Sequence, residues 1–234
     1  YVSFSQISDD GMIPTDADSY DKYTFSARGS HKVGALTFSS SLNYAYQKNK
    51  FATTGQGLSM LNSLYQSPRD VSIIGLEDQN DPFNTPGYYY TPYGVMNPYY
   101  ILENYLNEYE SERFYGKFQL DYEFLKYFKF TYRMGLDTTT GQSDKGKPNL
   151  YALYYEGTPN GEGQGSSSPF SGETGQYTEQ ITRRREINQD IMVNFNMPIS
   201  DFNINALVGF NGNERKVSYQ YSEVNDLTIP TWFN

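Results

Sequence analysis

The sequence has no cysteine, only one histidine, and no long uninterrupted run of apolar residues. The absence of cysteine excludes a disulfide scaffold and a thiolate metal site. A membrane-spanning helix needs roughly 18 or more consecutive apolar residues, so any crossing of a membrane must be made by strands. Basic clusters are also scarce, since the net charge is −9 and the only short basic run is Arg183, Arg184 and Arg185. This balance argues against nucleic acid as a partner.

The sequence also lacks a grouping of residues that supports catalysis. His31 falls in a predicted short turn with no serine or carboxylate constellation around it, so we interpret it as a solvated side chain. The main acidic groups are Asp9 with Asp10, Asp16 with Asp18, and Glu77 with Asp78. None of them has the ligand spacing of a calcium-binding loop. We therefore predict that the chain is not an enzyme and holds no metal and no cofactor.

The sequence is rich in aromatic residues, with 24 Tyr and 15 Phe, and it alternates apolar and polar residues. The clearest example runs from Phe128 to Leu136, where every second residue is large and apolar. The same alternation recurs over 22–28, 36–46, 113–122, 187–195 and 202–210. A period of two is typical of a strand with one apolar face. Counting a partial strand at 1–7, the chain is predicted to hold about seven strands and one short helix over 58–65.

One strand changes its pattern partway along. Beyond Gly212 the apolar positions move to Val217, Tyr219 and Tyr221, which is a change of parity. A single extra residue in one strand produces such a change, so we predict a β-bulge near Gly212 and Asn213.

The predicted connections alternate between short and long. Short turns lie at 31–34, 123–126 and 198–201, and long segments lie at 8–21, 52–111, 138–179 and from 223 onward. Outer-membrane β-barrels combine short periplasmic turns with long extracellular loops and with aromatic girdles at both interfaces. Aromatic residues stand near both predicted strand ends: Tyr44, Tyr46 and Phe51 towards a long loop, and Tyr122, Phe124, Tyr127 and Phe128 around a short turn.

The fold class predicted from these patterns is all-β, a segment of an antiparallel transmembrane β-barrel with long extracellular loops. The alternative is a soluble β-sandwich, whose inner face normally favours Val, Ile and Leu over aromatic residues. Complete bacterial barrels have an even number of strands from eight upward. Residues 1–234 are therefore expected to be part of one barrel domain, in which the remaining strands belong to residues outside the chain.

Several strings of residues in order carry a family resemblance. The first is Tyr1-Val2-Ser3-Phe4-Ser5-Gln6, followed by Asp10-Gly11-Met12-Ile13-Pro14 and Tyr20-Asp21-Lys22-Tyr23-Thr24-Phe25. The next are Asn97-Pro98-Tyr99-Tyr100 leading to Glu112-Arg113-Phe114-Tyr115-Gly116, and Asp226-Leu227-Thr228-Ile229-Pro230 with Phe233-Asn234. Taken together, the set spans nearly the whole chain and resembles the barrel domain of SusC/RagA-like TonB-dependent transporters.

That resemblance implies a roughly 22-stranded barrel in the bacterial outer membrane, with an N-terminal plug domain. It also implies energy supplied through TonB, a SusD-like surface lipoprotein as partner, and oligosaccharide or peptide as cargo. The plug and the TonB-contact segment have no counterpart in these residues. The expected function is active import of a nutrient across the outer membrane.

The long segment 52–111 is the best place to look for a binding site. It carries the predicted substrate-binding tyrosines Tyr88, Tyr89, Tyr90, Tyr93, Tyr99 and Tyr100. An aromatic ring with a hydroxyl tip can pack on a sugar or a peptide and make one hydrogen bond. The alternative is that these rings pack the loop on itself or on a partner cap, because long ordered loops need a core of their own.

Polar residues on the other side of the predicted strands are expected to face the barrel lumen or the plug. They are Arg28, Lys117, Gln119, Lys129, Arg133, Asn188, Asp190 and Asn194. Most are expected to form cross-strand polar pairs. The run Arg183 to Arg185 lies near the predicted outer leaflet, where it either meets phosphates of lipopolysaccharide or is an ordinary solvated strand end.

Two other kinds of function stay open at this stage. One is a TonB-dependent receptor for a metal chelate, or a passive porin. The other is a soluble or surface β-rich adhesion module with no transport role. A plug domain and a TonB-contact segment upstream of Tyr1 favour a transporter, whereas a secretion signal followed directly by repeats favours the adhesion module.

Overall fold

The structure is a computed structural model that describes residues 1–86, 96–154 and 173–233. Its strands are β1 (Val2–Asp9), β2 (Ser19–Val33), β3 (Leu36–Lys50), β4 (Leu106–Phe124), β5 (Phe128–Asn149), β6 (Thr174–Ile199) and β7 (Phe202–Asn225). Its helices are α1 (Met60–Gln66), η1 (Pro82–Asn84), α2 (Pro98–Asn104) and α3 (Leu150–Tyr154). The predicted seven strands and the short helix near 58–65 are confirmed.

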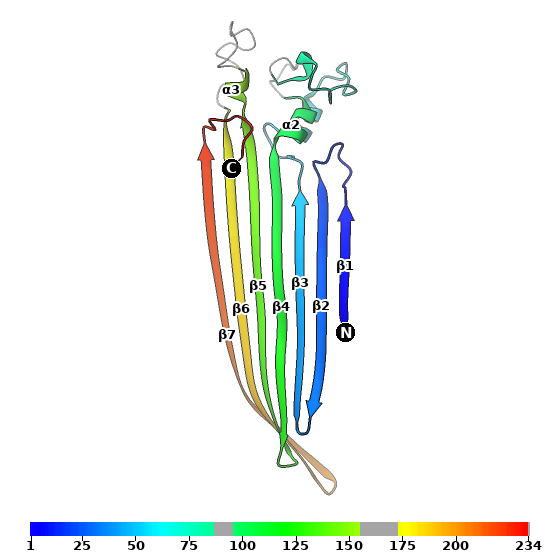
Figure 1. Cartoon of the computed structure of the whole chain (residues 1–234), viewed down its shortest axis with the longest axis vertical. Helices are drawn as coiled ribbons and strands as arrows, with labels where there is room; N and C mark the ends of the chain where they lie inside the picture. Colours follow the sequence, from blue (N-terminus) through cyan, green and yellow to red (C-terminus); the bar gives the residue numbers. More distant parts are fainter. Residues whose placement is uncertain (87–95, 155–172, 234) are drawn as a thin grey trace.

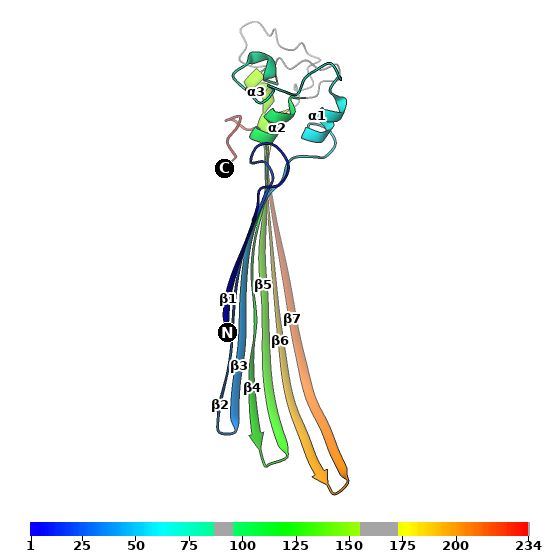
Figure 2. The ribbon, with the colours of Figure 1, turned by 90° about the vertical axis from the view of Figure 1, so that its right-hand side faces the viewer.

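The seven strands form one antiparallel sheet in which each strand pairs with its neighbours in sequence. The short turns all lie at one end of the sheet, here called the turn end, and the helices lie at the other, the loop end (Figure 1). Seen edge-on, the sheet is narrow near the loops and fans out towards the turns (Figure 2). Among the described residues, no helix is both long and apolar enough to cross a membrane.

The hydrogen-bonded ladder between β6 and β7 runs without a break. Gln189 pairs with Gly212 and Asn188 with Asn213, and the same register continues from Ile199 to Gln176. The predicted β-bulge at Gly212 and Asn213 is therefore wrong. Val217 instead lies on the opposite face from Phe210, because the apolar pattern itself changes sides along a regular strand.

The strands extend further towards the loop end than the sequence predicts. Residues 138–149 and 174–179 were expected in a loop but belong to β5 and β6. Both faces are polar there, as in Thr138, Thr139 and Thr140, so these residues carry no signal of period two. Pairing with the neighbouring strands, which the sequence pattern does not display, keeps them extended.

The three hairpin turns fall within three residues of their predicted positions. Gly34, Leu125, Lys126 and Ser200 all have positive φ, which suits tight connections between antiparallel strands. His31, expected in a turn, instead lies within β2 opposite Phe38. It is exposed at the turn-end part of that strand.

Opposed residues of an antiparallel ladder point to the same side, so the register divides the side chains into two faces. The apolar face comprises Phe4, Phe25, Phe38, Leu42, Tyr44, Phe114, Phe118, Leu120, Tyr122, Phe130, Met134, Ile187, Ile191, Val193, Val208 and Phe210. Many of these are open to the surroundings, with Ile191 45% and Phe210 71% exposed. The other side is called the polar face.

The apolar face forms a band that crosses the ladder obliquely. One rung joins Tyr23, Tyr46, Glu112, Thr140 and Arg183, so it starts aromatic on β2 and ends basic on β6. The turns descend in the same direction, from β2–β3 to β4–β5 to β6–β7 (Figures 1 and 2). A band at constant height crosses the rungs in this way only when the strands are tilted, as they are in a barrel wall.

Aromatic rings are concentrated at both ends of the band. At the turn end, Phe124 stacks on Tyr122 and Phe128 with centroids 5.9 and 5.5 Å apart. At the loop end, Tyr23 stacks on Phe4 and Tyr46 at 6.5 and 6.3 Å. Between these clusters, the apolar run from Phe128 to Leu136 matches the roughly 9 to 11 residues of a tilted membrane strand.

The main hydrophobic core of the described residues lies above the sheet, in the loops. It is formed by Met60, Met96, Tyr100, Ile101 and Leu150, with Ile13 packed against it. These residues come from three separate connections, β1–β2, β3–β4 and β5–β6. We call this assembly the loop cap.

Asn97 ties the loop cap together at the start of α2. Its side chain is fully buried, donates to the carbonyls of Leu76 and Asn84, and accepts from the N–H of Tyr99. The amide accepting from the first turn is an N-cap, and Pro98 suits the first helical position because it has no N–H to satisfy. The Asn97-Pro98 pair therefore fixes where α2 begins.

A charge placed on the apolar band tests the assignment of the two faces. If the band faces lipid, as the sequence predicts, Ile191→Arg puts a guanidinium in the middle of the band on β6 at a cost of about 2–4 kcal/mol. We expect the full-length protein to show reduced assembly, measured as folded barrel in the membrane fraction. Met192→Arg, one residue away on the polar face, is the matched control and is expected to assemble normally; equal losses in both variants would contradict the assignment.

Removal of the buried amide tests the loop cap. Asn97→Ala leaves two carbonyls and an N–H without their partner, which we expect to destabilise the cap locally by about 2–4 kcal/mol. Amide hydrogen exchange of the full-length protein should speed up in α1 and α2 while the strands stay protected. Asn104→Ala, which removes only one hydrogen bond to the carbonyl of Tyr100 in the last turn of α2, is the milder control. Unchanged exchange in Asn97→Ala would refute the role of Asn97.

Candidate functional site

The polar face collects all the residues that the sequence places towards a lumen. They are Arg28, Lys117, Gln119, Lys129, Arg133, Asn188, Asp190 and Asn194. Arg28, Lys117 and Asn188 lie on one rung of the ladder, carried by β2, β4 and β6. The structure thus places the whole set on a single surface.

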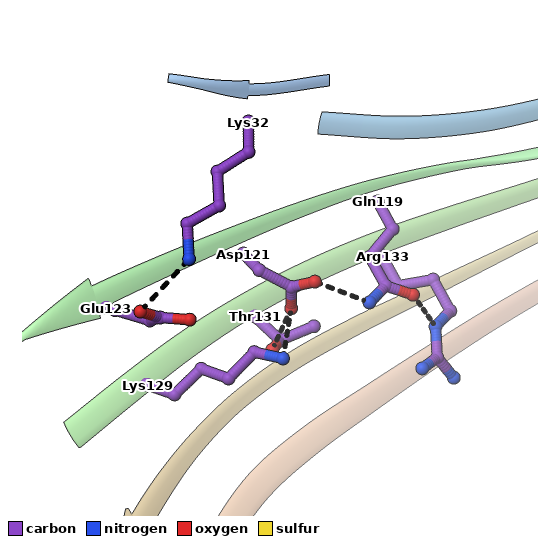
Figure 3. A network of polar contacts seen from close by, with 7 residues as sticks. All are labelled: Lys32, Gln119, Asp121, Glu123, Lys129, Thr131 and Arg133. Atoms are coloured by element: carbon purple, nitrogen blue, oxygen red, sulfur yellow. Dashed lines mark hydrogen bonds and ion pairs between the residues drawn. The ribbon is translucent and has the colours of Figure 1, made fainter. Parts of the chain in front are cut away.

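A network of polar contacts joins β4 and β5 near the turn end (Figure 3). The carboxylate of Asp121 accepts hydrogen bonds from Thr131 Oγ1 at 2.6 Å and Gln119 Nε2 at 2.9 Å, and pairs with Lys129 at 3.3 Å. Gln119 in turn accepts from Arg133 Nε at 3.1 Å. A carboxylate with three partners on two strands fixes the relative position of these side chains.

The network continues across β6 to β7. Arg133 lies 3.8 Å from a carboxylate oxygen of Asp190, and Asn211 donates to both Asp190 at 2.7 Å and Asn188 at 2.6 Å. On the β2 side, Lys32 reaches Glu123 at 3.5 Å (Figure 3). Gln119, Lys129, Arg133, Asn188 and Asp190 thus make polar contacts on this face, most of them between neighbouring strands.

A hollow of about 560 Å³ opens on the polar face nearer the loop end. Its lining residues are Lys22, Thr24, Ala45, Gln47, Ser111, Arg113, Tyr115, Asp137, Thr139, Arg184, Arg185, Glu186 and Arg215. Four of these residues, Lys22, Arg113, Arg184 and Arg215, have basic side chains on the polar face, and two are acidic. The register points the side chain of Arg185 to the other face. The surroundings of the hollow are therefore positive in a chain that is negative overall. A hollow lined from six strands shows that the sheet is concave on this side.

The arginines in this hollow differ in their partners. Arg113 binds both oxygens of Asp137, at 3.0 and 2.6 Å, and lies 4.8 Å from the ring centre of Tyr115. Within the described part of the chain, no ion pair engages Arg184 or Arg215. Free guanidinium groups can bind a carboxylate with two parallel hydrogen bonds, so this part of the hollow suits an anionic ligand.

A second hollow, of about 390 Å³, lies where the loop cap meets the sheet. It is lined by parts of the β1–β2 and β3–β4 connections, including Glu103 and Tyr105. Burial raises the pKa of the Tyr105 phenol and also raises the pKa of the Glu103 carboxyl. Burial thus disfavours the charged form of each group, and this hollow has no excess of basic side chains.

The predicted substrate-binding tyrosines are divided by the structure. Tyr88, Tyr89, Tyr90 and Tyr93 lie outside the described residues. Tyr99 is half-buried in the first turn of α2, while Tyr100 is only 6% exposed and packs in the core of the loop cap. Tyr100 therefore has a packing role, and a contact between the other tyrosines and cargo stays a prediction.

Several of the acidic residues noted in the sequence accept hydrogen bonds from nearby backbone N–H groups. The carboxylate of Asp18 accepts from the N–H groups of Met12 and Ile13, both at 3.1 Å. This carboxylate lies so close that a Cβ on Gly11 would stand 2.1 Å from it, and Gly11 has a φ of +70°. Glycine is thus required in this turn for space and for backbone conformation.

The segment after β7 folds back over the loop end of β5 and β6. Asn149 donates to the carbonyl of Leu227 at 2.9 Å, and its own N–H binds the carbonyl of Pro230 at 2.7 Å. The ring of Phe233 lies over Gly146, where a Cβ would stand 2.7 Å from it, and stacks on Tyr177. This segment closes one side of the loop end.

Sequence reasoning did not assign Arg113 and Arg215 to a site, and it grouped Arg184 with Arg183 and Arg185 near the outer leaflet rather than on the polar face. The alternation provides the missing signal for Arg184. Arg185 and Arg183 lie two and four residues before Ile187 and so share its apolar face, whereas Arg184 between them falls on the polar face. The position of Arg215 directly across the ladder from Glu186, in contrast, depends on the register between β6 and β7.

No protein-family model matches the chain, and no curated protein matches it in sequence. Solved structures of the RagAB peptide importer do match in fold. In the open-open state the TM-score is 0.62 with 14% identity, over 93% of this chain and 23% of the importer chain. In the closed-closed state the TM-score is 0.57 with 14% identity, over 90% of this chain and 22% of the other.

A further structure, of the RagAB peptide transporter, gives a TM-score of 0.59 and 16% identity over 90% of this chain and 22% of that one. The chain thus spans less than a quarter of the length of the proteins it matches. Identities this low show the fold, and the fold agrees with the family that the sequence strings resemble. The chain is an open seven-stranded antiparallel sheet whose fold is similar to that of a section of the RagAB chains.

Proposed function

We propose that the chain forms part of the wall and surface loops of a transporter that imports nutrients across the bacterial outer membrane. The observation that carries this proposal is the exposed apolar band. In the described ranges, no second sheet or helix covers residues such as Phe118, Ile191 and Val208. A soluble β-sandwich would bury this face, whereas lipid is the environment that an aromatic-edged band of this length fits.

The orientation follows from the two ends of the sheet. Outer-membrane barrels place short turns in the periplasm and long loops outside the cell. The loop cap and the segment after β7 then stand on the outer surface, and the Lys32–Glu123 pair lies near the periplasmic side. The polar face, which carries the basic hollow nearer the loop end, then faces the barrel lumen or the plug.

The partners and the energy source are part of the same proposal. The resemblance to SusC/RagA-like proteins implies a SusD-like lipoprotein over the outer opening and TonB acting through a segment of the longer protein. The loop cap supports this, because its buried core of Met96, Ile101 and Leu150 gives a partner an ordered surface to contact.

The cargo is proposed to be a peptide or an oligosaccharide, and the hollow favours the peptide. Arg184 and Arg215 present guanidinium groups on the polar face that no ion pair engages within the described ranges, and these suit the carboxylates of a peptide better than a neutral sugar. The matching structures are described as a peptide importer, which agrees with this choice. Tyrosines of the 52–111 loop, Tyr88, Tyr89, Tyr90, Tyr93 and Tyr99, are proposed to contact the cargo near the outer opening.

Fractionation and uptake by the full-length protein test the proposed function. We expect it to stay with the membrane until detergent is added and to co-purify with a surface lipoprotein. Uptake of labelled peptide by cells should stop when the proton gradient is collapsed, because TonB-dependent import needs energy. Release into buffer without detergent would contradict the barrel, and uptake that persists without the gradient would favour a passive porin.

The basic hollow gives a second test. The double variant Arg184→Gln/Arg215→Gln removes two positive charges from the polar face and leaves the Arg113–Asp137 pair in place. Hydrogen bonds to charged groups contribute about 1.5–3 kcal/mol. We therefore expect the uptake of a peptide with a free C-terminal carboxylate to fall by a factor of roughly ten or more. The amidated form of the same peptide serves as the control; an equal fall for both forms would show that the carboxylate is not recognised.

A further inference from the structure

The three consecutive arginines of β6 are divided between the two faces of the sheet. Arg184 lies on the polar face opposite Val217, within the hollow already described. Arg183 and Arg185 lie on the same face as Ile187, the last apolar residue of the band on this strand. A basic run that looks uniform in sequence therefore serves two different surfaces.

A third basic residue joins the two arginines on the apolar side. Lys216 of β7 is the direct cross-strand partner of Arg185, and Arg183 is opposite Ser218. We call Arg183, Arg185 and Lys216 the basic rim. All three side chains are exposed and stand directly beyond the apolar band, on the side of the loop end.

The charges of the basic rim are poorly balanced by the protein itself. Glu214 is the one acidic neighbour on β6 or β7 that bonds to it in the described structure, 3.2 Å from Arg185. Like charges directly opposite on adjacent strands, as in Arg185 and Lys216, destabilise a sheet. An external anion between them would offset this repulsion.

Acidic residues on the same face of β4 are occupied elsewhere. Glu110 pairs with Lys48 at 2.9 Å, and Glu112 accepts a hydrogen bond from Tyr44 at 3.3 Å. They lie two strands from β6, on the other side of β5, whose nearby residues on this face are Thr138 and Thr140. The positive excess is therefore local to β6 and β7.

We infer that the basic rim binds the phosphate groups of a lipid headgroup in the outer leaflet. The inference rests on the proposed function, because it takes the apolar band as the lipid-facing surface and the loop end as the outside. A phosphorylated lipid with its acyl chains against Ile187, Ile191 and Phe210 carries its phosphates at the level of the rim. The same lipid thus satisfies the band and the charges above it.

Binding of a phosphorylated lipid A preparation to the full-length detergent-solubilised protein tests the inference. We compare the wild type with Arg183→Gln/Arg185→Gln/Lys216→Gln by native mass spectrometry, using the same lipid after phosphatase treatment as the second probe. Near a membrane surface each basic residue contributes on the order of 1 kcal/mol, so the triple variant should bind the phosphorylated lipid roughly 10- to 100-fold more weakly. Binding of the dephosphorylated lipid should not change.

The matched control changes adjacent residues on the other face. Arg184→Gln/Arg215→Gln removes two positive charges from the same two strands and should leave lipid binding unchanged. The inference is overturned if the triple variant binds as tightly as the wild type, or if the control loses as much affinity. Competition by inorganic phosphate at concentrations comparable with the lipid would also overturn it, since the rim would then be a site for free anions.

The outcomes separate this inference from the proposed function. Each variant is first shown to be folded by its resistance to unfolding in detergent at room temperature. If the full-length protein is released into buffer without detergent, both the barrel and the lipid site are contradicted. If the protein is folded, membrane-bound and imports peptide, but binds the phosphorylated and dephosphorylated lipids equally, only the lipid site is contradicted.

Discussion

The unbroken antiparallel ladder from β1 to β7 is the constraint on which the other features of this chain depend. Side chains alternate between the two faces along every strand, so a slip of one residue would exchange the apolar and polar sets. The register keeps Phe130 level with Val193 and Val208 on one side, and Gln119 level with Arg133 and Asp190 on the other. It also sends Arg184 to a different surface from Arg183 and Arg185.

The same strands pass through two environments along their length. In the turn-end half one face is apolar and aromatic, whereas near the loop end both faces are polar and carry ion pairs such as Lys48 with Glu108 at 3.0 Å. The strands nevertheless stay paired to Asn149 and Thr174, and at this height they support the loop cap. In the part of the chain that the structure describes, the hydrophobic core therefore lies in three connections, and the sheet positions it.

The strings that resemble the transporter family occupy structural positions. Gly11 fits a turn closed by Asp18, Asn97 and Pro98 start α2, and Phe233 covers Gly146. Each requires a particular residue for space, backbone conformation or a buried hydrogen bond. Such positions set how the loops are arranged on the sheet. The resemblance therefore concerns the fold, and the residues that select the cargo lie elsewhere.

The sequence by itself determined the number of strands, the alternation of short turns and long loops, and the side of the sheet on which Lys117 and Arg133 lie. It could do so because a strand whose two faces meet different environments alternates apolar and polar residues. This alternation shows which side chains share a face. Where both faces are polar, as in Thr138–Asn149, the pattern disappears, and only pairing with β4 and β6 decides the conformation. Register between strands, which no single segment encodes, decided the unbulged β7, the loop cap, the hollow around Arg113, and the meeting of Arg185 with Lys216.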